Sequence, residues 1–386
     1  MSRVRKAVIV SPFDNYGYEV RNKYIEEILM DSRFDVRILS SDFDHRNKKQ
    51  YKVSRKNLEL IHVPEYKKNL SISRIFSHVI FAKKVYKRIE ELSPEIVYCS
   101  GPPNSVYKYI SKYKRKTPKV KVIFEIGDLW PETMPINDNI KKMMYPILRL
   151  WSGLRDNNTK YADGIVYECK MFENVVSKTH PDTAYKVLYL SKDDYYKEDF
   201  SLKEQFDEFR IAYVGSINNI IDCELIVDIL RLIGEKRKVC FVVIGGGEES
   251  KKLFEHCDKF GIDYENHGII YDPEEKHNIL STCQFGLNIM KNTVSVGATM
   301  KSLEYFHEGL ILINNIPADT ADIINHYGCG FNIVKDYTEV VKKISDLSDK
   351  DINSIRKNSR RVYEELFDTQ IFKKEFLRFL NDIQST

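Results

Sequence analysis

The segment TMKSLEYFHEGLILIN, residues 299–314, places a short amphipathic helix directly before a buried strand. Thr299 is a residue type that caps helix N-termini and Gly309 a type that ends helices, so together they predict a helix over 300–308. The apolar run that follows, 310–314, predicts a strand covered on both faces, as strands are in parallel sheets. A helix that leads straight into such a strand is the repeating unit of an α/β fold.

The same alternation of strand-like runs and amphipathic helices continues along the chain. Helices are expected, for example, over 18–31, 74–92 and 104–116. The strand-like runs fall into two sets: 6–11, 35–40, 95–100, 121–125, 164–168 and 186–190 in the first, and 210–215, 239–247, 285–289, 310–314 and 331–334 in the second.

A polar, acidic stretch at 191–209 separates the two sets of strands. At 386 residues the chain is longer than one compact domain of roughly 150 residues. The sequence therefore predicts two doubly wound Rossmann-like domains, over 1–195 and 196–365, with a ligand crevice between them. The segment 366–386 contains no strand-like run and is expected to be a helix that packs back on the N-terminal domain.

The composition argues against several classes of function. The net charge is only +4 and no long basic block occurs, so a nucleic-acid partner is not expected. The seven cysteines are never spaced as CxxC, which predicts small buried thiols in a reducing compartment rather than a zinc site or disulfides. No apolar stretch reaches the length of about 18 residues that crosses a bilayer, and the N-terminal run is too short for a signal peptide, so a cytoplasmic protein is expected.

Two strand ends in the second set carry glycines. Gly215 ends AYVG, and the triplet 245–247 ends VVIGGG before a helix. Glycine lets the backbone approach a ligand, and free N–H groups at the start of a helix attract an anion or a ribose. A purely structural turn explains the triplet equally well.

Two charged residues stand in the first turns of the helix predicted at 300–308. Met300, Leu303 and Phe306 are expected to form its packed side, whereas Lys301 and Glu304 share a different side. An ammonium beside free N–H groups suits a diphosphate, and a carboxylate can accept two hydrogen bonds from ribose hydroxyls. The alternative is an exposed ion pair between the two residues.

Residues 205–335 resemble the nucleotide-sugar-binding domain of family-four retaining glycosyltransferases with the GT-B fold. The matching pieces are AYVGS, VVIGGGEE, NHGIIYDPEEKHNILSTCQFGLNI and SVGATMKSLEYFHEGLILIN. The resemblance implies that Lys301 meets the donor phosphates, that Glu304 meets the ribose, and that 269–271 lies by the base. The full set of donor-binding residues it implies is Gly215, Ser216, Asn218, Gly245, Gly246, Gly247, Ile270, Lys291, Thr299, Lys301, Ser302 and Glu304.

The first domain adds FEIGDLWPETMP, 124–135, which resembles the DLWPES stretch of enzymes from the same family that build bacterial surface polysaccharides. Asp128 would then face the crevice and join Lys301 as a catalytic residue. The alternative is that Asp128 caps the turn before Trp130–Pro131. By the same resemblance, a loop with Asn15, Tyr16 and Gly17 would lie under the transferred sugar.

Two positions depart from the family pattern. Val296 stands where many members carry a carboxylate, and no cation occurs in 215–221, where many carry an arginine and a lysine. Neutralisation of the phosphates would then depend on Lys301, Lys291 and backbone amides.

The resemblance implies a glycosyltransferase that moves a sugar from a nucleotide-sugar donor to a glycan or lipid-linked glycan acceptor, with retention of configuration. A non-catalytic GT-B partner subunit and a nucleotide-sugar epimerase are the alternatives. No metal or other cofactor is expected, because Asp42 and Asp44 form only a lone Asp-x-Asp and the histidines show no ligand spacing.

The segments 138–160 and 75–89 combine apolar side chains with lysine and arginine. Each is expected to be a helix whose apolar side faces the core and whose basic side is solvated. Peripheral docking on an anionic membrane at the cytoplasmic face is the alternative. Whether the chain forms an oligomer, alone or with a second protein, stays open.

Overall fold

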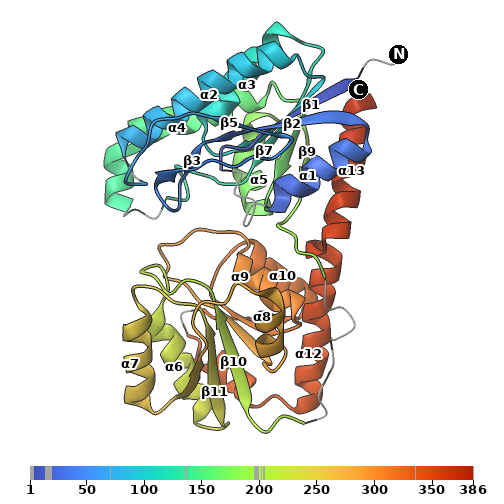
Figure 1. Ribbon diagram of the computed structural model, residues 1–386. Helices are drawn as coiled ribbons and strands as arrows, with labels where there is room; N and C mark the ends of the chain where they lie inside the picture. Colours follow the sequence, from blue (N-terminus) through green and yellow to red (C-terminus); the bar gives the residue numbers. More distant parts are fainter. Residues whose placement is uncertain are drawn as a thin grey trace. The chain divides into compact units, whose positions relative to one another are not determined.

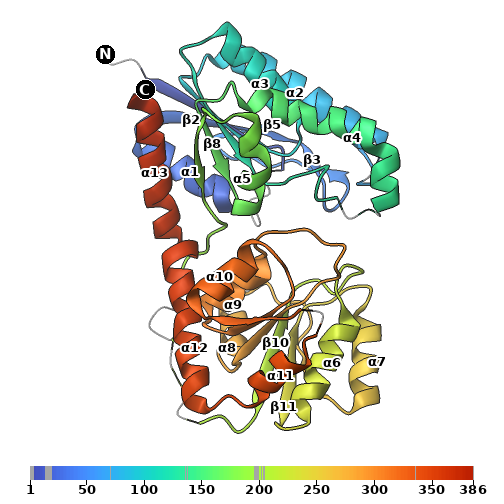
Figure 2. The ribbon, with the colours of Figure 1, turned by 180° about the vertical axis from the view of Figure 1, so that it is seen from behind.

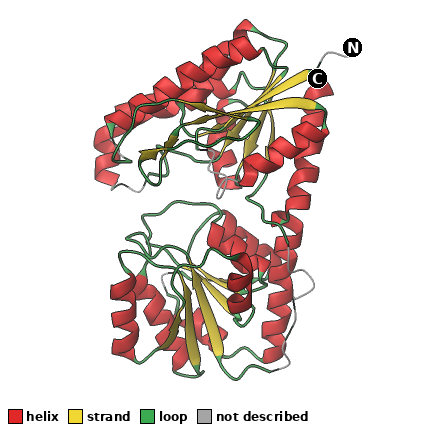
Figure 3. Ribbon diagram, viewed as in Figure 1, coloured by secondary structure: helices red, strands yellow, loops and turns green. Residues whose placement is uncertain are grey.

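The computed structural model describes residues 4–13, 20–69, 71–134, 136, 138–194, 200, 202, 205–334 and 336–385. The chain divides into two compact units, Met1–Tyr189 with Phe372–Thr386, and Leu190–Ile371. Each unit is a parallel sheet with helices packed against it (Figures 1 and 3). The predicted α/β class is therefore confirmed.

The first unit contains a seven-stranded sheet in the order β5-β2-β1-β6-β7-β8-β9, in which all neighbours are parallel. The predicted strands are present, although the run at 186–190 is paired only up to Val187. The sequence did not reveal β5, a half-buried edge strand with a glutamate in its middle. The strands are β1 (Arg5–Val10), β2 (Phe34–Ser41), β5 (Leu58–Ile61), β6 (Ile96–Gly101), β7 (Lys121–Ile126), β8 (Gly164–Tyr167) and β9 (Ala184–Val187), with a separate hairpin of β3 (Phe43–Asp44) and β4 (Lys49–Gln50).

Helices cover this sheet on both faces. On one face α1 (Val20–Asp31) and α13 (Thr369–Ser385) enclose a core with the strands, in which Ile9 and Tyr98 meet Ile25 and Phe376. The other face carries α2 (Ile72–Leu92), α3 (Ser105–Lys116) and α4 (Asp138–Thr159), which lie side by side in both views (Figures 1 and 2). Two shorter helical segments, α5 (Lys170–Val176) and η1 (Ser177–Thr179), follow β8.

The first half of α4 is not a core-facing helix, which corrects the expectation from its sequence. Met143, Ile147 and Leu150 are 77%, 60% and 76% exposed, and only the second half of the helix is buried, at Arg155 and Thr159. The start of α2 likewise exposes three apolar side chains, Ile72, Ile75 and Phe76. Among the described residues, no helix is both long and apolar enough to cross a membrane.

The second unit contains a six-stranded sheet in the order β12-β11-β10-β13-β14-β15, again parallel throughout. The winding direction changes between β10 and β13, and ligands of doubly wound sheets bind at the carboxyl ends of strands at such a point. The sequence did not reveal β12, a polar edge strand. The strands are β10 (Phe209–Val214), β11 (Val239–Ile244), β12 (Asp263–Asn266), β13 (Phe285–Asn288), β14 (Ile311–Asn314) and β15 (Gly330–Asn332).

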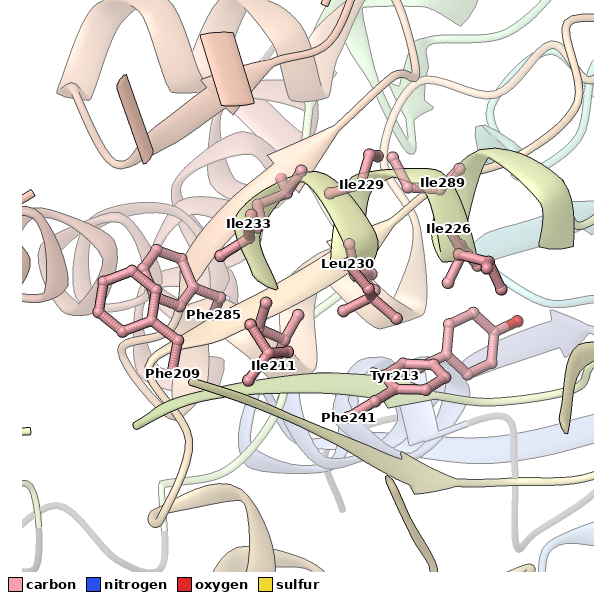
Figure 4. Packing of buried hydrophobic residues seen from close by; sticks show 14 of the residues in the cluster. Phe209, Ile211, Tyr213, Ile226, Ile229, Leu230, Ile233, Phe241, Phe285 and Ile289 are labelled. Atoms are coloured by element: carbon pink, nitrogen blue, oxygen red, sulfur yellow. The ribbon is translucent and has the colours of Figure 1, made fainter. Parts of the chain in front are cut away.

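The core of the second unit is formed where α6 (Cys223–Gly234) packs on the sheet. Figure 4 shows Ile226 and Leu230 of this helix directed toward Ile211 and Phe241 of the strands, and all four are buried. All seven cysteines of the chain are buried free thiols, as predicted. The other helices are α7 (Ser250–Phe260), α8 (Pro273–Leu280), α9 (Met300–His307), α10 (Asp319–Tyr327), α11 (Thr338–Ser345), α12 (Asp349–Val362) and a π-helical turn η3 (Tyr363–Phe367).

Tyr305 fixes α9 to the two central strands of this sheet. Its buried hydroxyl accepts a hydrogen bond from the N–H of Val214 at 2.9 Å and donates one to the carbonyl of Leu287 at 3.2 Å. A Cβ atom on Gly286 would lie 2.4 Å from the Tyr305 ring, so the ring can rest on β13 only because residue 286 is glycine. Tyr305 therefore contributes to the position of α9 on the sheet.

Replacement of Tyr305 by phenylalanine should lower the free energy of unfolding by about 1–3 kcal/mol, because a buried N–H and a buried carbonyl lose their partner. Urea unfolding at pH 7 measures the change. Tyr271→Phe is the matched control, since Tyr271 is exposed. Equal stability of the two variants would show that the Tyr305 hydroxyl does not anchor the helix.

Candidate functional site

The candidate site of the second unit begins where the loops after β10 and β11 meet. A Cβ atom on Gly245 would lie 2.0 Å from the carbonyl oxygen of Gly215, and one on Gly247 would lie 2.3 Å from that of Ile217. Gly215 and Gly245 also have positive φ angles, +117° and +155°. Gly245 and Gly247 are therefore required for backbone-to-backbone contact between the two loops. This contact supports the interpretation of the glycine triplet as a structural turn.

The remaining predicted residues of these loops differ in their surroundings. Ser216 is exposed, whereas the side chain of Asn218 accepts a hydrogen bond from the N–H of Ile220 at 3.2 Å and so stabilises its own turn. Lys291 is exposed and is attached to the same turn through its backbone N–H. Ile270 is half-buried beside Ile269, whose side chain lies 3.5 Å from the place of a Cβ on Gly246.

The N-terminus of α9 is held by a capping box, which confirms Thr299 as the N-cap. The Thr299 hydroxyl accepts a hydrogen bond from the N–H of Ser302 at 3.0 Å, and the Ser302 hydroxyl accepts one from the N–H of Thr299 at 3.1 Å. Ser302 is fully buried. Both side chains are thus occupied in positioning the helix, and the N–H groups of Met300 and Lys301 remain the orphan donors of its first turn.

A row of asparagines connects this cap to the sheet. Asn288, Asn314 and Asn332 are the last residues of β13, β14 and β15 and stand in register. Their side chains are joined by hydrogen bonds of 2.9 Å each, and Asn288 accepts a further bond of 3.0 Å from the Thr299 hydroxyl. Sequence reasoning missed this row, although an asparagine at the end of three successive strands is unusual for strand composition.

The sequence predicts Met300 on the packed side of α9, but this residue is exposed. Leu303 and Phe306 are buried as predicted, but Met300 is 51% exposed, because Ser302 and Tyr305 occupy the side toward the sheet. Gly309 has a φ of +62° and follows the end of the helix at His307, one residue earlier than predicted.

Lys301 lies across Gly215. A Cβ atom on Gly215 would be 3.4 Å from Cε of Lys301, and the Nζ atom is 4.9 Å from the centre of the Tyr213 ring. This Nζ is buried and has no hydrogen-bond partner among the residues that the structure describes. Burial lowers the pKa of Lys301 to about 8. A buried ammonium without a counter-charge is costly, and an anion at this place would neutralise it.

Glu304 is held between two lysines. Its Oε2 is 2.6 Å from Nζ of Lys192 and its Oε1 is 3.3 Å from Nζ of Lys276. Burial alone would raise the pKa of Glu304, but Lys192 and Lys276 outweigh it and leave the pKa lowered. Glu304 is therefore paired with these two lysines. The exposed ion pair between Glu304 and Lys301, which was the alternative from the sequence, is not formed.

No sequence pattern indicated that these two lysines belong to the site. Lys192 lies 112 positions before Glu304 and comes from the polar stretch between the two sets of strands, and Lys276 is on α8. The backbone of Lys192 is bonded to Phe367 and Tyr363, so its place depends on η3. Only the fold brings these charges to α9.

The C-terminal end of α9 is held by buried charged groups. The Glu308 carboxylate bonds Nδ1 of His277 and Nδ1 of His307, each at 2.8 Å. Burial would raise the pKa of Glu308, but these hydrogen bonds lower it to about 2. From α12, Arg356 donates to the carbonyl of Gly309 at 3.1 Å, and Arg360 donates to that of His307. Both ends of the helix are thus fixed.

In the first unit, Asp128 follows β7 and bonds within its own loop. Its Oδ1 accepts a hydrogen bond from the Thr133 hydroxyl at 3.2 Å. Burial raises the pKa of Asp128 to about 6, although Thr133 and the N–H groups of Leu129 and Trp130 act in the opposite direction. Asp128 thus stabilises the turn and is also a half-buried carboxyl group whose pKa is raised to about 6. The predicted residues Asn15, Tyr16 and Gly17 lie outside the described residues.

The lone Asp-x-Asp has structural partners. Asp42 bonds His62 and the N–H of Val63, and Asp44 bonds the N–H groups of Arg46 and Asn47 in its own hairpin. Within the described ranges, no group of three histidine, cysteine or acidic side chains is arranged to hold a metal ion. Independence from metal stays a prediction.

Comparison with known proteins identifies the fold. No protein-family model and no curated protein matches the chain. Among solved structures, a sucrose-phosphate synthase from Thermosynechococcus elongatus aligns over 99% of both chains with a TM-score of 0.69 and 10% identity. Anabaena HepE in complex with UDP aligns over 98% of this chain and 100% of its own, with a TM-score of 0.69 and 12% identity.

A third structure, the lipopolysaccharide outer core galactosyltransferase WaaB, covers 97% of this chain and 99% of its own at a TM-score of 0.64 and 16% identity. Together with the two parallel sheets, these similarities show that the chain has the GT-B fold, as the sequence predicts. At such low identity they show the fold alone.

Replacement of Lys301 by methionine should raise the free energy of unfolding at pH 7 by about 1–3 kcal/mol, because each unit of pKa depression corresponds to about 1.4 kcal/mol of disfavoured charge. Chemical denaturation measures the change. Lys251→Met is the control, since the Lys251 side chain is exposed and its replacement should alter stability little. A Lys301→Met protein that is less stable than wild type would mean that the ammonium is satisfied in the free protein.

Proposed function

We propose that the protein is a glycosyltransferase that binds a nucleotide-sugar donor at the N-terminus of α9 and transfers the sugar, with retention of configuration, to a glycan or lipid-linked glycan. The observation that carries this proposal is the buried ammonium of Lys301, which has no hydrogen-bond partner among the described residues, beside the orphan N–H groups of a capped helix. That pairing suits the diphosphate of a donor. HepE, which shares the fold, has been solved with UDP and with UDP-glucose.

The proposed donor site extends from α9 in two directions. Glu304 accepts hydrogen bonds from the ribose hydroxyls, while Lys192 and Lys276 keep it ionised and add positive charge. The exposed Ile269 and Tyr271, with Ile270 between them, offer an apolar surface for the base. Gly215 leaves room for the diphosphate beside Lys301, because any side chain there would contact the lysine stem.

The chemistry proposed for the site is charge stabilisation. As the bond to the sugar breaks, negative charge grows on the leaving diphosphate, and Lys301 with the helix N-terminus stabilises it. The leaving oxygen takes the proton of the attacking acceptor hydroxyl on the same face of the sugar, which retains the configuration. Asp128 would orient that hydroxyl, and the cations take the role of a divalent metal ion.

The alternative of a non-catalytic partner subunit rests on the lack of a cation in 215–221. Lys192 and Lys276 supply positive charge from other elements, which favours the enzyme. Hydrolysis of a nucleotide sugar by the purified chain separates the two, because a partner subunit has no such activity.

Glu304→Gln should weaken UDP binding by a factor of about ten or more, since charge-assisted hydrogen bonds contribute about 1.5–3 kcal/mol. Binding of inorganic pyrophosphate, which has no ribose, should not weaken in the same variant. Calorimetric titration measures both, with the exposed Glu274→Gln as control. Unchanged UDP affinity in a folded Glu304→Gln protein would contradict the ribose assignment.

Asp128→Asn should lower turnover at least tenfold, a barrier increase of about 1.4 kcal/mol, because asparagine keeps the turn but cannot carry charge. UDP affinity and melting temperature should change little. In the wild type, turnover should fall as the pH is lowered through about 6, where the carboxylate becomes protonated. A lower melting temperature with full turnover would show that Asp128 only stabilises its turn.

We further propose that the first unit docks on an anionic membrane surface. The exposed residues Ile140, Met143, Ile147 and Leu150 of α4 are spaced three and four apart, which places them on one side of the helix. Every charged residue in 139–155 and in 66–89 is basic, including those around the exposed start of α2. An apolar stripe flanked by Lys141, Lys142 and Arg149 complements an anionic leaflet.

The double substitution Met143→Ser and Leu150→Ser should weaken binding to phosphatidylglycerol vesicles at least tenfold, since each buried apolar side chain contributes about 1.5–3 kcal/mol. Sedimentation with vesicles measures the bound fraction, and Val175→Ser, at an exposed position of α5, is the control. Equal binding to phosphatidylcholine vesicles, or no loss in the double variant, would contradict the membrane assignment.

A further inference from the structure

A group of basic and aromatic side chains lies in the first unit, at the carboxyl edge of its parallel sheet. His45 and Lys48 belong to the β3–β4 hairpin, which follows β2, and Tyr66 belongs to the loop that follows β5. Arg74 and His78 lie in the first two turns of α2. Because these segments follow the carboxyl ends of parallel strands, they are at the edge where α/β sheets bind ligands. We call these five residues the cationic cluster.

The two permanent cations of the cluster are held close together. Lys48 donates to the side-chain oxygen of Asn69, and Arg74 donates to the backbone carbonyl of the same residue at 2.9 Å. Both stand over the ring of Tyr66, with Nζ of Lys48 at 5.0 Å and Cζ of Arg74 at 5.9 Å from its centre. The guanidinium of Arg74 also lies 5.1 Å from the ring of Trp130, which restricts its orientation.

The charges of Asp44 and Asp128 attract Lys48 and Arg74, respectively. In the part of the chain that the structure describes, neither Lys48 nor Arg74 forms an ion pair with a carboxylate, although both are partly buried. Burial, and next the charge of Arg74, lowers the pKa of Lys48. Two like charges in a partly desolvated place repel each other, and an anion between them would remove that repulsion.

Three buried polar atoms of the cluster are poorly satisfied by the residues that the structure describes. The Tyr66 hydroxyl, Nε of Arg74 and Nε2 of His78 are buried and lack a hydrogen bond of ordinary geometry among the described residues, although the Tyr66 hydroxyl and the Arg74 side chain interact with each other. Tyr66 is only 3% and His78 only 9% exposed. Such atoms are normally satisfied in folded proteins, so a group that satisfies several at once is to be expected here. Burial, and next the charges of Arg74 and His45, lowers the pKa of His78 to about 3, which keeps its ring neutral.

The geometry points to a binding site for a phosphate group in the first unit, formed by Arg74, Lys48 and the Tyr66 hydroxyl. A phosphate, whose oxygens accept hydrogen bonds from several directions, fits donors that come from a hairpin, a loop and a helix. Asp128 interacts electrostatically with Arg74 and therefore lies nearby. The proposed function has Asp128 orient the acceptor, so the phosphate would belong to the acceptor. The identity of the phosphate's carrier therefore rests on the proposed function.

The test uses the full chain and inorganic pyrophosphate as the probe, measured by equilibrium dialysis. Saturating UDP fills the site at Lys301, so the remaining binding reports the cationic cluster. Arg74→Gln and Lys48→Met should each weaken this binding at least tenfold, Arg74→Lys should weaken it less, and Lys83→Met, an exposed position of α2, should not change it. Melting temperatures show that the variants are folded.

The outcomes separate this inference from the proposed function. If UDP does not bind, the donor site is wrong, and the same comparison is made in Lys301→Met protein without UDP. Pyrophosphate binding that is absent, or unchanged by Arg74→Gln and Lys48→Met, overturns the inference, as does equal competition by acetate. Displacement by glucose 1-phosphate assigns a soluble phosphate, and displacement by vesicles containing phosphatidic acid assigns a lipid phosphate.

Discussion

The buried ammonium of Lys301 is the constraint around which the second unit is arranged. Its pKa of about 8, against an ordinary value of 10.5, corresponds to roughly 3 kcal/mol of unfavourable burial. A domain tolerates such a cost only if the rest of the helix is firmly held. Tyr305 on Gly286, the capping box at Thr299 and the arginines of α12 provide that support. In the proposed function, the stability that they contribute holds the Lys301 charge in place for the diphosphate.

Glu304 shows the opposite arrangement one turn further along. Its carboxylate is fully paired with Lys192 and Lys276, so it is ionised and oriented before any ligand arrives. A group oriented in advance loses little conformational entropy on binding, which is the general advantage of a preorganised site. The backbone of Lys192 is held by hydrogen bonds to η3, so this π-helical turn also supports the site.

The sequence predicted the fold where its patterns are local. Most strands, the start of α9 and the role of Thr299 follow from periodicity and capping preferences, which act over a few residues. The edge strands β5 and β12 were missed, because half-exposed strands with polar residues lack a continuous apolar run. Met300 was assigned to the wrong side because the three-residue spacing alone did not show that Tyr305 faces the sheet.

The residues that form the candidate sites were harder to predict from the sequence than the fold. Lys301 and Glu304 could be selected from one short segment, but the lysines around Glu304 come from distant parts of the chain. The exposure of α4 depends on which helices neighbour it, and an amphipathic pattern has the same appearance whether its apolar side is buried or free. The cationic cluster combines a hairpin, a loop and a helix whose residues share no motif.

The central claim is that Lys301 is an unneutralised buried cation that awaits a diphosphate. The most direct measurement is an NMR titration of the lysine side-chain Cε signals, with the Lys301 signal identified by its loss in the Lys301→Met variant. The account predicts a pKa of about 8 in the free protein and a rise toward the ordinary value when UDP is bound. An ordinary pKa in the free protein that does not respond to UDP would contradict it.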